Sequence, residues 1–230
     1  MIVTGRFVFL HLHKSGGTFV NECLLRFVPD ARQVGYHLPR SLVPAGSAAL
    51  PVLGLVRNPW SYYLSWYAFQ SQRRQPNVLF QLMSADRTLD FRGTVRNLIE
   101  LGDNPALLDQ LIAALPPAYV NRGINLPGFA LEAIRGSGLG FYSYLYRYMY
   151  EGPGTPHIGC MERMRSELQS MFASVGQPVD SPMAAYIARA PAQNVSEHGH
   201  YRDYYDAALR RLVEQRDSAL IERFGYRYGD

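Results

Sequence analysis

The chain begins with an apolar run, a glycine loop and a helical pattern, one directly after another. Residues 7–12 read FVFLHL, a mixture of aromatic, β-branched and leucine residues typical of a buried strand. The loop HKSGGT follows at 13–18, and apolar residues then recur at helical spacing at Phe19, Val20, Cys23, Leu24 and Phe27. The pattern predicts a strand, a loop and a helix. In such a unit the loop N–H groups and the helix dipole point the same way and can bind an anion, although many purely structural turns also need glycine.

Lys14, in this loop, is the one lysine of the chain. The sequence has 23 basic residues, and all the others are arginine. An ammonium is a compact charge on a flexible stem, whereas a guanidinium is a planar fork. A position that keeps lysine in such an arginine-rich chain therefore suggests a role that arginine does not fill.

Further strands are expected after the first unit. Apolar runs predict a second strand near residues 34–37, a third at 52–56 and a short one near 157–160. Helical patterns lie between and after them, and strands that alternate with helices favour a parallel sheet. The expected fold class is therefore α/β, a central parallel sheet flanked by helices, with a P-loop-like strand, loop and helix at its start.

The helices can be placed from their start signals and apolar stripes. Asn58 suits an N-cap and Pro59 the first turn, so a helix is expected from Trp60 to about Gln72, with Trp60, Tyr63, Leu64 and Tyr67 facing inward. Further helices are expected at about 163–175 and 206–224, with a loop at 176–200. Because strand signals fade between about residues 73 and 151, that segment reads as a helical insertion in a single domain covering residues 1–230.

Composition excludes several classes of protein. No apolar run approaches the 18 residues of a membrane span, and the apolar residues at the start are too few for a signal peptide, so a cytoplasmic protein is expected. Cys23 and Cys160 are too few for a disulfide framework and are expected to be buried. The net charge of +4 suits anionic ligands but is far from the basic stripe of a nucleic-acid binder.

Three stretches of the chain resemble motifs of the sulfotransferase family. The loop at 13–19, HKSGGTF, is similar to the family's 5′-phosphosulfate loop, whose common form is Pro-Lys-Ser-Gly-Thr-Thr-Trp. VRNP at 56–59, followed by Ser65, resembles the 3′-phosphate motif, and YHLP at 36–39 resembles the stretch that holds the catalytic histidine. The tail from Tyr201 to Tyr226 also looks like that of bacterial and carbohydrate sulfotransferases.

The resemblance implies roles for particular residues. The co-substrate would be 3′-phosphoadenosine 5′-phosphosulfate (PAPS), with Lys14 neutralising the leaving oxygen and His37 taking the proton of the acceptor hydroxyl. The cofactor-binding residues it implies are Lys14, Ser15, Gly16, Gly17, Thr18, Phe19, Arg57 and Ser65. No metal is required, and the partner is a hydroxyl-bearing small molecule, lipid or glycan.

The chain also departs from the family pattern. His13 replaces the proline, Gly17 replaces a threonine and Phe19 replaces the tryptophan that stacks on adenine in many relatives. Gly35 replaces a lysine two positions before the histidine, and no late Arg-Lys-Gly segment is found. His37 could also be a loop histidine that is hydrogen-bonded to the main chain, so Glu22 and His13 are kept as alternative bases.

Other classes of function stay open at this point. His11 and His13 share a strand face, and with His198 or His200 they could form a three-histidine zinc site for hydrolysis. A P-loop nucleotide kinase is opposed by the order of the loop, because that motif places its lysine after the glycines. A non-catalytic nucleotide- or glycan-binding protein on the same scaffold would bind the nucleotide without turnover.

Overall fold

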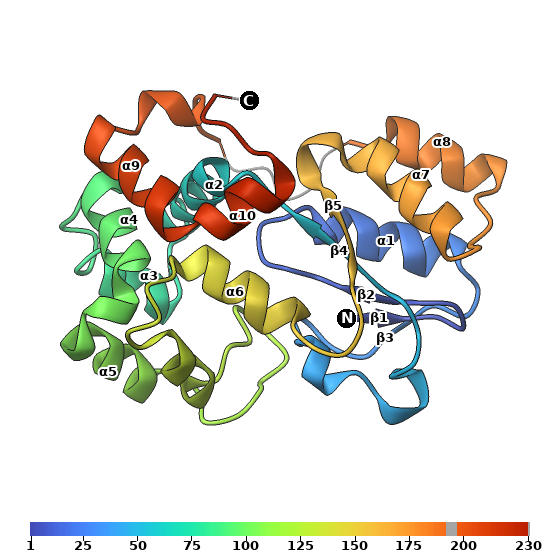
Figure 1. Cartoon of the computed structure of the whole chain (residues 1–230), viewed down its shortest axis with the longest axis horizontal. Coiled ribbons are helices and arrows are strands. Elements are labelled where there is room, and N and C mark those ends of the chain that lie inside the picture. The colour runs from blue at the N-terminus through green and yellow to red at the C-terminus, as the bar shows by residue number, and fades with distance from the viewer. Residues whose placement is uncertain (192–196, 230) are drawn as a thin grey trace. The chain divides into compact units, whose positions relative to one another are not determined.

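The computed structural model describes residues 1–191 and 197–229 (Figure 1). It divides into two compact units. Unit 1 consists of Met1–Arg57 and Tyr146–Val195, and unit 2 consists of Asn58–Leu145 and Ser196–Asp230. Most of the expected helical insertion, together with the C-terminal helices, falls in unit 2. The prediction of a single domain over residues 1–230 stays a prediction.

Unit 1 contains a five-stranded sheet with the order β3-β1-β2-β4-β5. The strands are β1 (Ile2–Val3), β2 (Val8–Leu10), β3 (Arg32–Gln33), β4 (Val52–Val56) and β5 (His157–Cys160). β2, β4 and β5 are parallel, with Phe9 opposite Leu53 and Leu53 opposite His157. β1 is antiparallel to both β2 and β3. The predicted α/β class is confirmed, with two short antiparallel strands added at one edge.

Helices α1 (Gly17–Phe27), α7 (Met164–Ser174) and α8 (Ser181–Arg189) pack on one face of this sheet (Figure 1). Alternate strand residues point to this face, because side chains along a strand alternate between its two sides. They form one apolar core with the helices, which includes Phe7, Phe9, Leu53, Leu55, Phe19, Val20, Leu24, Leu168, Phe172 and Ile187. Cys23 and Cys160 are both buried free thiols, as expected.

Unit 2 is helical. Its helices are α2 (Pro59–Ser71), α3 (Val78–Met83), α4 (Phe91–Ile99), α5 (Pro105–Ala114), α9 (Ala207–Arg216) and α10 (Ser218–Phe224), together with the first half of α6 (Phe141–Tyr150). Asn58 is the N-cap of α2, as predicted, and its Oδ1 accepts hydrogen bonds from the N–H groups of Trp60 and Ser61 at 3.1 and 3.4 Å. Trp60, Tyr63 and Leu64 are buried and Tyr67 is half-buried, so the predicted inward face is confirmed.

Three predicted elements differ from the structure. The second strand lies at Arg32–Gln33 rather than 34–37, because Tyr36 and His37 turn away from the sheet edge toward the end of β2. The expected loop at 176–200 contains α8, which begins at an Asp180 N-cap. The expected helix at 206–224 is interrupted at Asp217, whose buried carboxylate bonds to groups outside its own helix.

Within residues 1–191 and 197–229, no helix combines the length and apolarity needed to cross a bilayer.

Candidate functional site

The glycine loop lies at the carboxyl end of β2 and leads into α1. Two of its residues have left-handed backbone conformations, Lys14 with φ 55° and Gly16 with φ 80°. Such angles are rare for a residue with a side chain and turn the chain sharply. Arg57 follows the parallel neighbour β4, and its Nη1 donates to the main-chain oxygen of Lys14 at 3.3 Å. The two cationic residues are therefore brought together at the same edge of the sheet.

The N-terminus of α1 is open in the sense that its N-cap residue, Gly16, has no side chain to cap it and its first turn has no acidic residue. Six α-helices in the described parts of the chain are instead capped by the side chain of their own N-cap residue, which is Asn58, Asn77, Asp90, Asn104, Asp180 or Asp206. Because the first N–H groups of a helix have no partner within the helix, α1 presents donors and a positive dipole end that suit an anion.

The hydroxyl residues of the loop differ in accessibility. Ser15 is buried, and its Oγ donates to the main-chain oxygen of His13 at 3.2 Å. Thr18, in the first turn of α1, is half-buried. A bound anion could reach Thr18 more readily than Ser15, whose hydroxyl stabilises the turn.

Lys14 lies in an environment that disfavours its charge. Burial, and secondly the neighbouring Arg57 guanidinium, lower the pKa of Lys14 to about 8. Both effects act against the ammonium, one by removing water and the other by repulsion. An anion bound beside these two groups would relieve the repulsion.

His37 lies beside the loop with a fixed imidazole. Its backbone is left-handed, with φ 50°, and its Nδ1 is 2.7 Å from the main-chain oxygen of His11. A carbonyl oxygen only accepts hydrogen bonds, so Nδ1 must hold the proton. The other ring nitrogen, Nε2, then carries a lone pair when His37 is neutral, which is the form a general base needs.

Two further histidine rings surround His37. The His13 ring stacks on it with centroids 3.7 Å apart, and the His11 ring lies at 4.3 Å. Burial, and then the nearby His13 and His11, hold the pKa of His37 well below its ordinary value. Burial likewise lowers the pKa of His11 to about 3. Both imidazoles are therefore neutral near pH 7.

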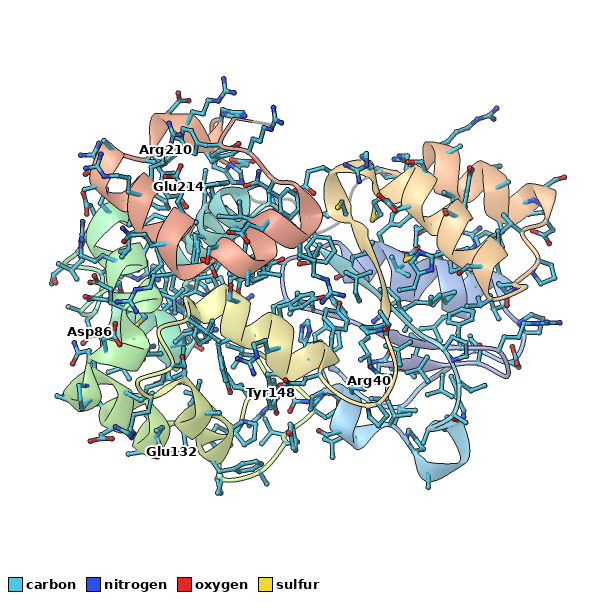
Figure 2. The ribbon with its side chains drawn as sticks, in the orientation of Figure 1. Arg40, Asp86, Glu132, Tyr148, Arg210 and Glu214 are labelled. Atoms are coloured by element: carbon cyan, nitrogen blue, oxygen red, sulfur yellow. The ribbon has the colours of Figure 1, made fainter. Side chains whose placement is uncertain are left out.

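The loop that holds His37 is fixed by two residues that sequence reasoning missed, Arg40 and Tyr150. The Arg40 guanidinium donates to the main-chain oxygens of Tyr150, Pro153 and Gly154, in the segment that follows α6 (Figure 2). The Tyr150 hydroxyl bonds to the main chain of Leu55. A Cβ at Gly54 would approach the Tyr150 ring to 2.3 Å. A glycine inside a strand often marks such a close approach, so Gly54 was the available signal.

The remaining sequence candidates lie elsewhere. Phe19 is 2% exposed in the core of unit 1, where Tyr186 stacks on it at 5.2 Å, so its ring offers little surface to an adenine. Ser65 is buried on α2, in unit 2. Glu22 lies on the exposed side of α1, where it bonds to Tyr186. The roles given to these three residues stay predictions.

The three-histidine zinc site that the sequence left open has no support among the described residues. His11 and His13 belong to unit 1, whereas His198 and His200 belong to unit 2. His200 accepts a hydrogen bond from the Arg202 N–H and caps a short helix. Across the residues that the structure describes, no three His, Cys, Asp or Glu side chains are grouped so that they could hold a metal ion.

Comparisons with known proteins give a match by structure and none by sequence. No family model matches the chain, and no curated protein matches it by sequence. Among solved structures, the fold is similar to that of mouse sulfotransferase SULT7A1 complexed with PAP, with a TM-score of 0.50 and 13% identity. The match covers 96% of this chain and 87% of that one. At this identity the match shows the fold alone.

Proposed function

We propose that this protein is a sulfotransferase that moves a sulfuryl group from PAPS to a hydroxyl group of its acceptor. The observation that supports this most directly is the open start of α1, with Lys14 and Arg57 beside it and the neutral His37 next to the loop. The fold match agrees with it, because the similar structure is that of a sulfotransferase.

The loop would bind the 5′-phosphosulfate end of the co-substrate. N–H groups at the start of α1 and the half-buried Thr18 hydroxyl would donate to the phosphate oxygens, which accept strong charge-assisted bonds. Lys14 would lie against the bridging oxygen, where negative charge grows as the bond to sulfur breaks. Arg57 would hold the 3′-phosphate, a role that the sequence resemblance also gives to Ser65. The Phe19 ring is enclosed in the core of unit 1 and offers adenine little surface.

His37 would act as the general base. The acceptor oxygen forms a bond to sulfur while the bond between sulfur and the 5′-phosphate oxygen breaks, and the acceptor proton passes to Nε2 of His37. The products are a sulfate ester and 3′-phosphoadenosine 5′-phosphate (PAP). Because Nδ1 donates to the His11 oxygen, the imidazolium formed in this step keeps a hydrogen-bond partner.

Two measurements test this function. Calorimetry is expected to show that PAP binds about 10- to 100-fold more tightly than AMP, because a 3′-phosphate adds one charged hydrogen bond. Mass spectrometry of reactions with PAPS and a panel of phenols, alcohols and glycans should then show addition of a sulfuryl group. Equal affinities for PAP and AMP would contradict the nucleotide assignment, and tight PAP binding with no transfer to any acceptor would favour the binding-protein alternative.

A histidine variant separates catalysis from binding. His37→Ala is expected to bind PAP normally and to slow transfer about 10²- to 10⁴-fold, the usual range for a general base. The matched control is His157→Ala, at the amino end of β5, where the exposed ring bonds to the Ser174 hydroxyl at the end of α7. Normal transfer in His37→Ala would move the base role to His13 or Glu22.

A further inference from the structure

Gly17 and His11 approach each other more closely than any other residue type at position 17 would permit. A Cβ built on Gly17 would lie 2.0 Å from Cδ2 of His11, 2.4 Å from Cγ and 2.6 Å from Nε2. Gly17 is not among the residues with positive φ, so its backbone is one that alanine adopts without strain. The three atoms nearest to such a Cβ all belong to the His11 ring, which therefore excludes a side chain at this position of the loop.

The His11 ring is fixed from a second direction by Asn21. The ring is buried, with 4% exposure, and its Nδ1 lies 3.3 Å from the side-chain nitrogen of Asn21. The amide nitrogen is the donor, so Nδ1 of His11 accepts and the ring proton is on Nε2. Gly17 and Asn21 are four residues apart on α1, and such residues lie on the same face of a helix. The His11 ring thus contacts the start of α1 at two points one turn apart, Gly17 and Asn21.

The main chain of the same residue fixes the other half of the site. The His11 oxygen accepts the hydrogen bond from Nδ1 of His37, and this bond leaves Nε2 of His37 unprotonated. The position of that oxygen depends on where the end of β2 lies, and the buried ring anchors that end against α1. One residue consequently contacts both the anion loop and the candidate base.

We propose that His11 is a positioning residue that sets the distance between the anion loop and His37, and that Gly17 is glycine in this chain to receive its ring. The proposal rests on the proposed function for its catalytic meaning. The steric part of the proposal, that the His11 ring excludes a side chain at position 17, does not depend on which ligand the loop binds. It also explains why position 17 is glycine, where the sulfotransferase motif has threonine.

A cycle of variants tests the coupling. Gly17→Ala, His11→Ala and the double variant are compared with the wild-type protein by thermal unfolding without nucleotide and by calorimetry with PAP. Gly46→Ala serves as the matched control, because it lies in the same unit and a Cβ there meets no atom within 4 Å. Nitrogen NMR of the labelled protein reports which nitrogen of His37 holds the proton.

The expected result is rescue of one substitution by the other. Gly17→Ala should lower the melting temperature and weaken PAP binding about 10- to 100-fold, the effect of losing one charged hydrogen bond. The double variant should melt higher and bind PAP more tightly than Gly17→Ala, since the ring that the added methyl group would strike is gone. If Gly17→Ala does not fold, recovery of the fold in the double variant would likewise show that residues 11 and 17 are coupled.

Other outcomes overturn the inference. A double variant whose losses equal the sum of the single losses would show that the two positions act independently, and so would a Gly17→Ala protein that behaves like Gly46→Ala. A proton on Nε2 of His37 in the wild type would remove the link to the base. If the wild type does not bind PAP, the proposed function fails, while the unfolding measurements still decide whether residues 11 and 17 are coupled.

Discussion

The starts of helices α1 and α6 can be compared. α1 lies in unit 1 and α6 begins in unit 2, and the two differ in whether a carboxylate of the protein accepts a hydrogen bond from the first turn. Each follows a glycine, Gly16 before α1 and Gly140 before α6. α1 begins with no side-chain cap and no acid in its first turn. α6 receives a carboxylate from a distant part of the sequence, because Asp217 Oδ1 accepts from the Ser143 N–H at 2.9 Å.

The carboxylate at α6 is fully enclosed. Asp217 has no exposed surface, and it also accepts hydrogen bonds from the Ser143 and Tyr63 hydroxyls at 2.6 and 2.8 Å. A Cβ at Gly140 would lie 2.8 Å from the Asp217 oxygens, so only glycine lets the carboxylate come this close. Burial raises the pKa of Asp217 to about 6, and the hydrogen bonds partly oppose that rise.

The difference shows two uses of one physical feature. Unpaired N–H groups and the helix dipole favour a negative charge at any helix start. In unit 2 the protein supplies that charge with the Asp217 carboxylate, which also links the end of α9 to α6. In unit 1 it supplies cations nearby, Lys14 and Arg57, and no acid in the first turn, which suits an anion from outside.

The largest expected effect concerns the ammonium beside the open helix start. Lys14→Arg should slow sulfuryl transfer about 100- to 1,000-fold, the loss typical of removing one group that stabilises charge in the transition state. The charge is kept, but a planar guanidinium does not replace a compact ammonium at a single bridging oxygen. Rates with saturating PAPS measure the effect, and Lys14→Met shows how much a charge without the correct geometry contributes. Wild-type rates in Lys14→Arg would remove Lys14 from the mechanism.

At the closed helix start, loss of the carboxylate should reduce stability instead of binding. Asp217→Ala leaves the Ser143 and Tyr63 donors buried without a partner and should lower the free energy of unfolding by about 3 kcal/mol. Urea titration followed by circular dichroism measures it. Asp206→Ala, at the partly exposed N-cap of α9, is the matched control and should cost only about 1 kcal/mol. Equal losses in the two variants would mean that burial adds nothing at Asp217.

A third substitution tests the comparison by placing a carboxylate at the start of α1, where the wild-type protein has none. Thr18→Asp places a carboxylate in the first turn, where it should stabilise the helix by roughly 0.3–1 kcal/mol. The same charge would repel a bound phosphate, so PAP affinity should fall about 100-fold. Calorimetry and urea titration report the two effects, with Thr18→Asn as the neutral control. Undiminished PAP binding by Thr18→Asp would show that the anion does not occupy this helix start.

The smallest expected effect is the pH dependence of the open site. The pKa of Lys14 is lowered to about 8, and only the ammonium form can neutralise a leaving oxygen. The charged form predominates below that pH, so kcat/KM should be level there and decline as pH rises through about 8. Lys14→Arg should lack this decline, because arginine keeps its charge at such pH. A decline that persists in Lys14→Arg belongs to another group.

Local sequence signals predicted some elements of the fold well. The run at 52–56 is β4, the Asn58 and Pro59 pair starts α2, and the apolar run at 7–12 contains β2, with the glycine loop directly after it. These signals work because capping, turn and burial preferences depend on a few neighbouring residues. The resemblance to sulfotransferase motifs, and not these local preferences, singled out Lys14, His37 and Arg57. The structure brings Lys14 into contact with Arg57, and His37 beside the loop that holds both Lys14 and His13.

By itself, then, the sequence determined the strand, loop and helix at the start of the chain, the α/β class and the motifs of the candidate site, all of which follow from residues close together in the chain. The tertiary structure alone decided that Asp217, between α9 and α10, accepts from the first turn of α6, that Arg40 bonds to the segment after α6, and that the His11 ring lies against Gly17. The physical reason is that these are contacts between residues far apart in the chain or set by the packing of buried rings. No local propensity encodes the distance between such groups, and the folded chain fixes it only when its elements pack together.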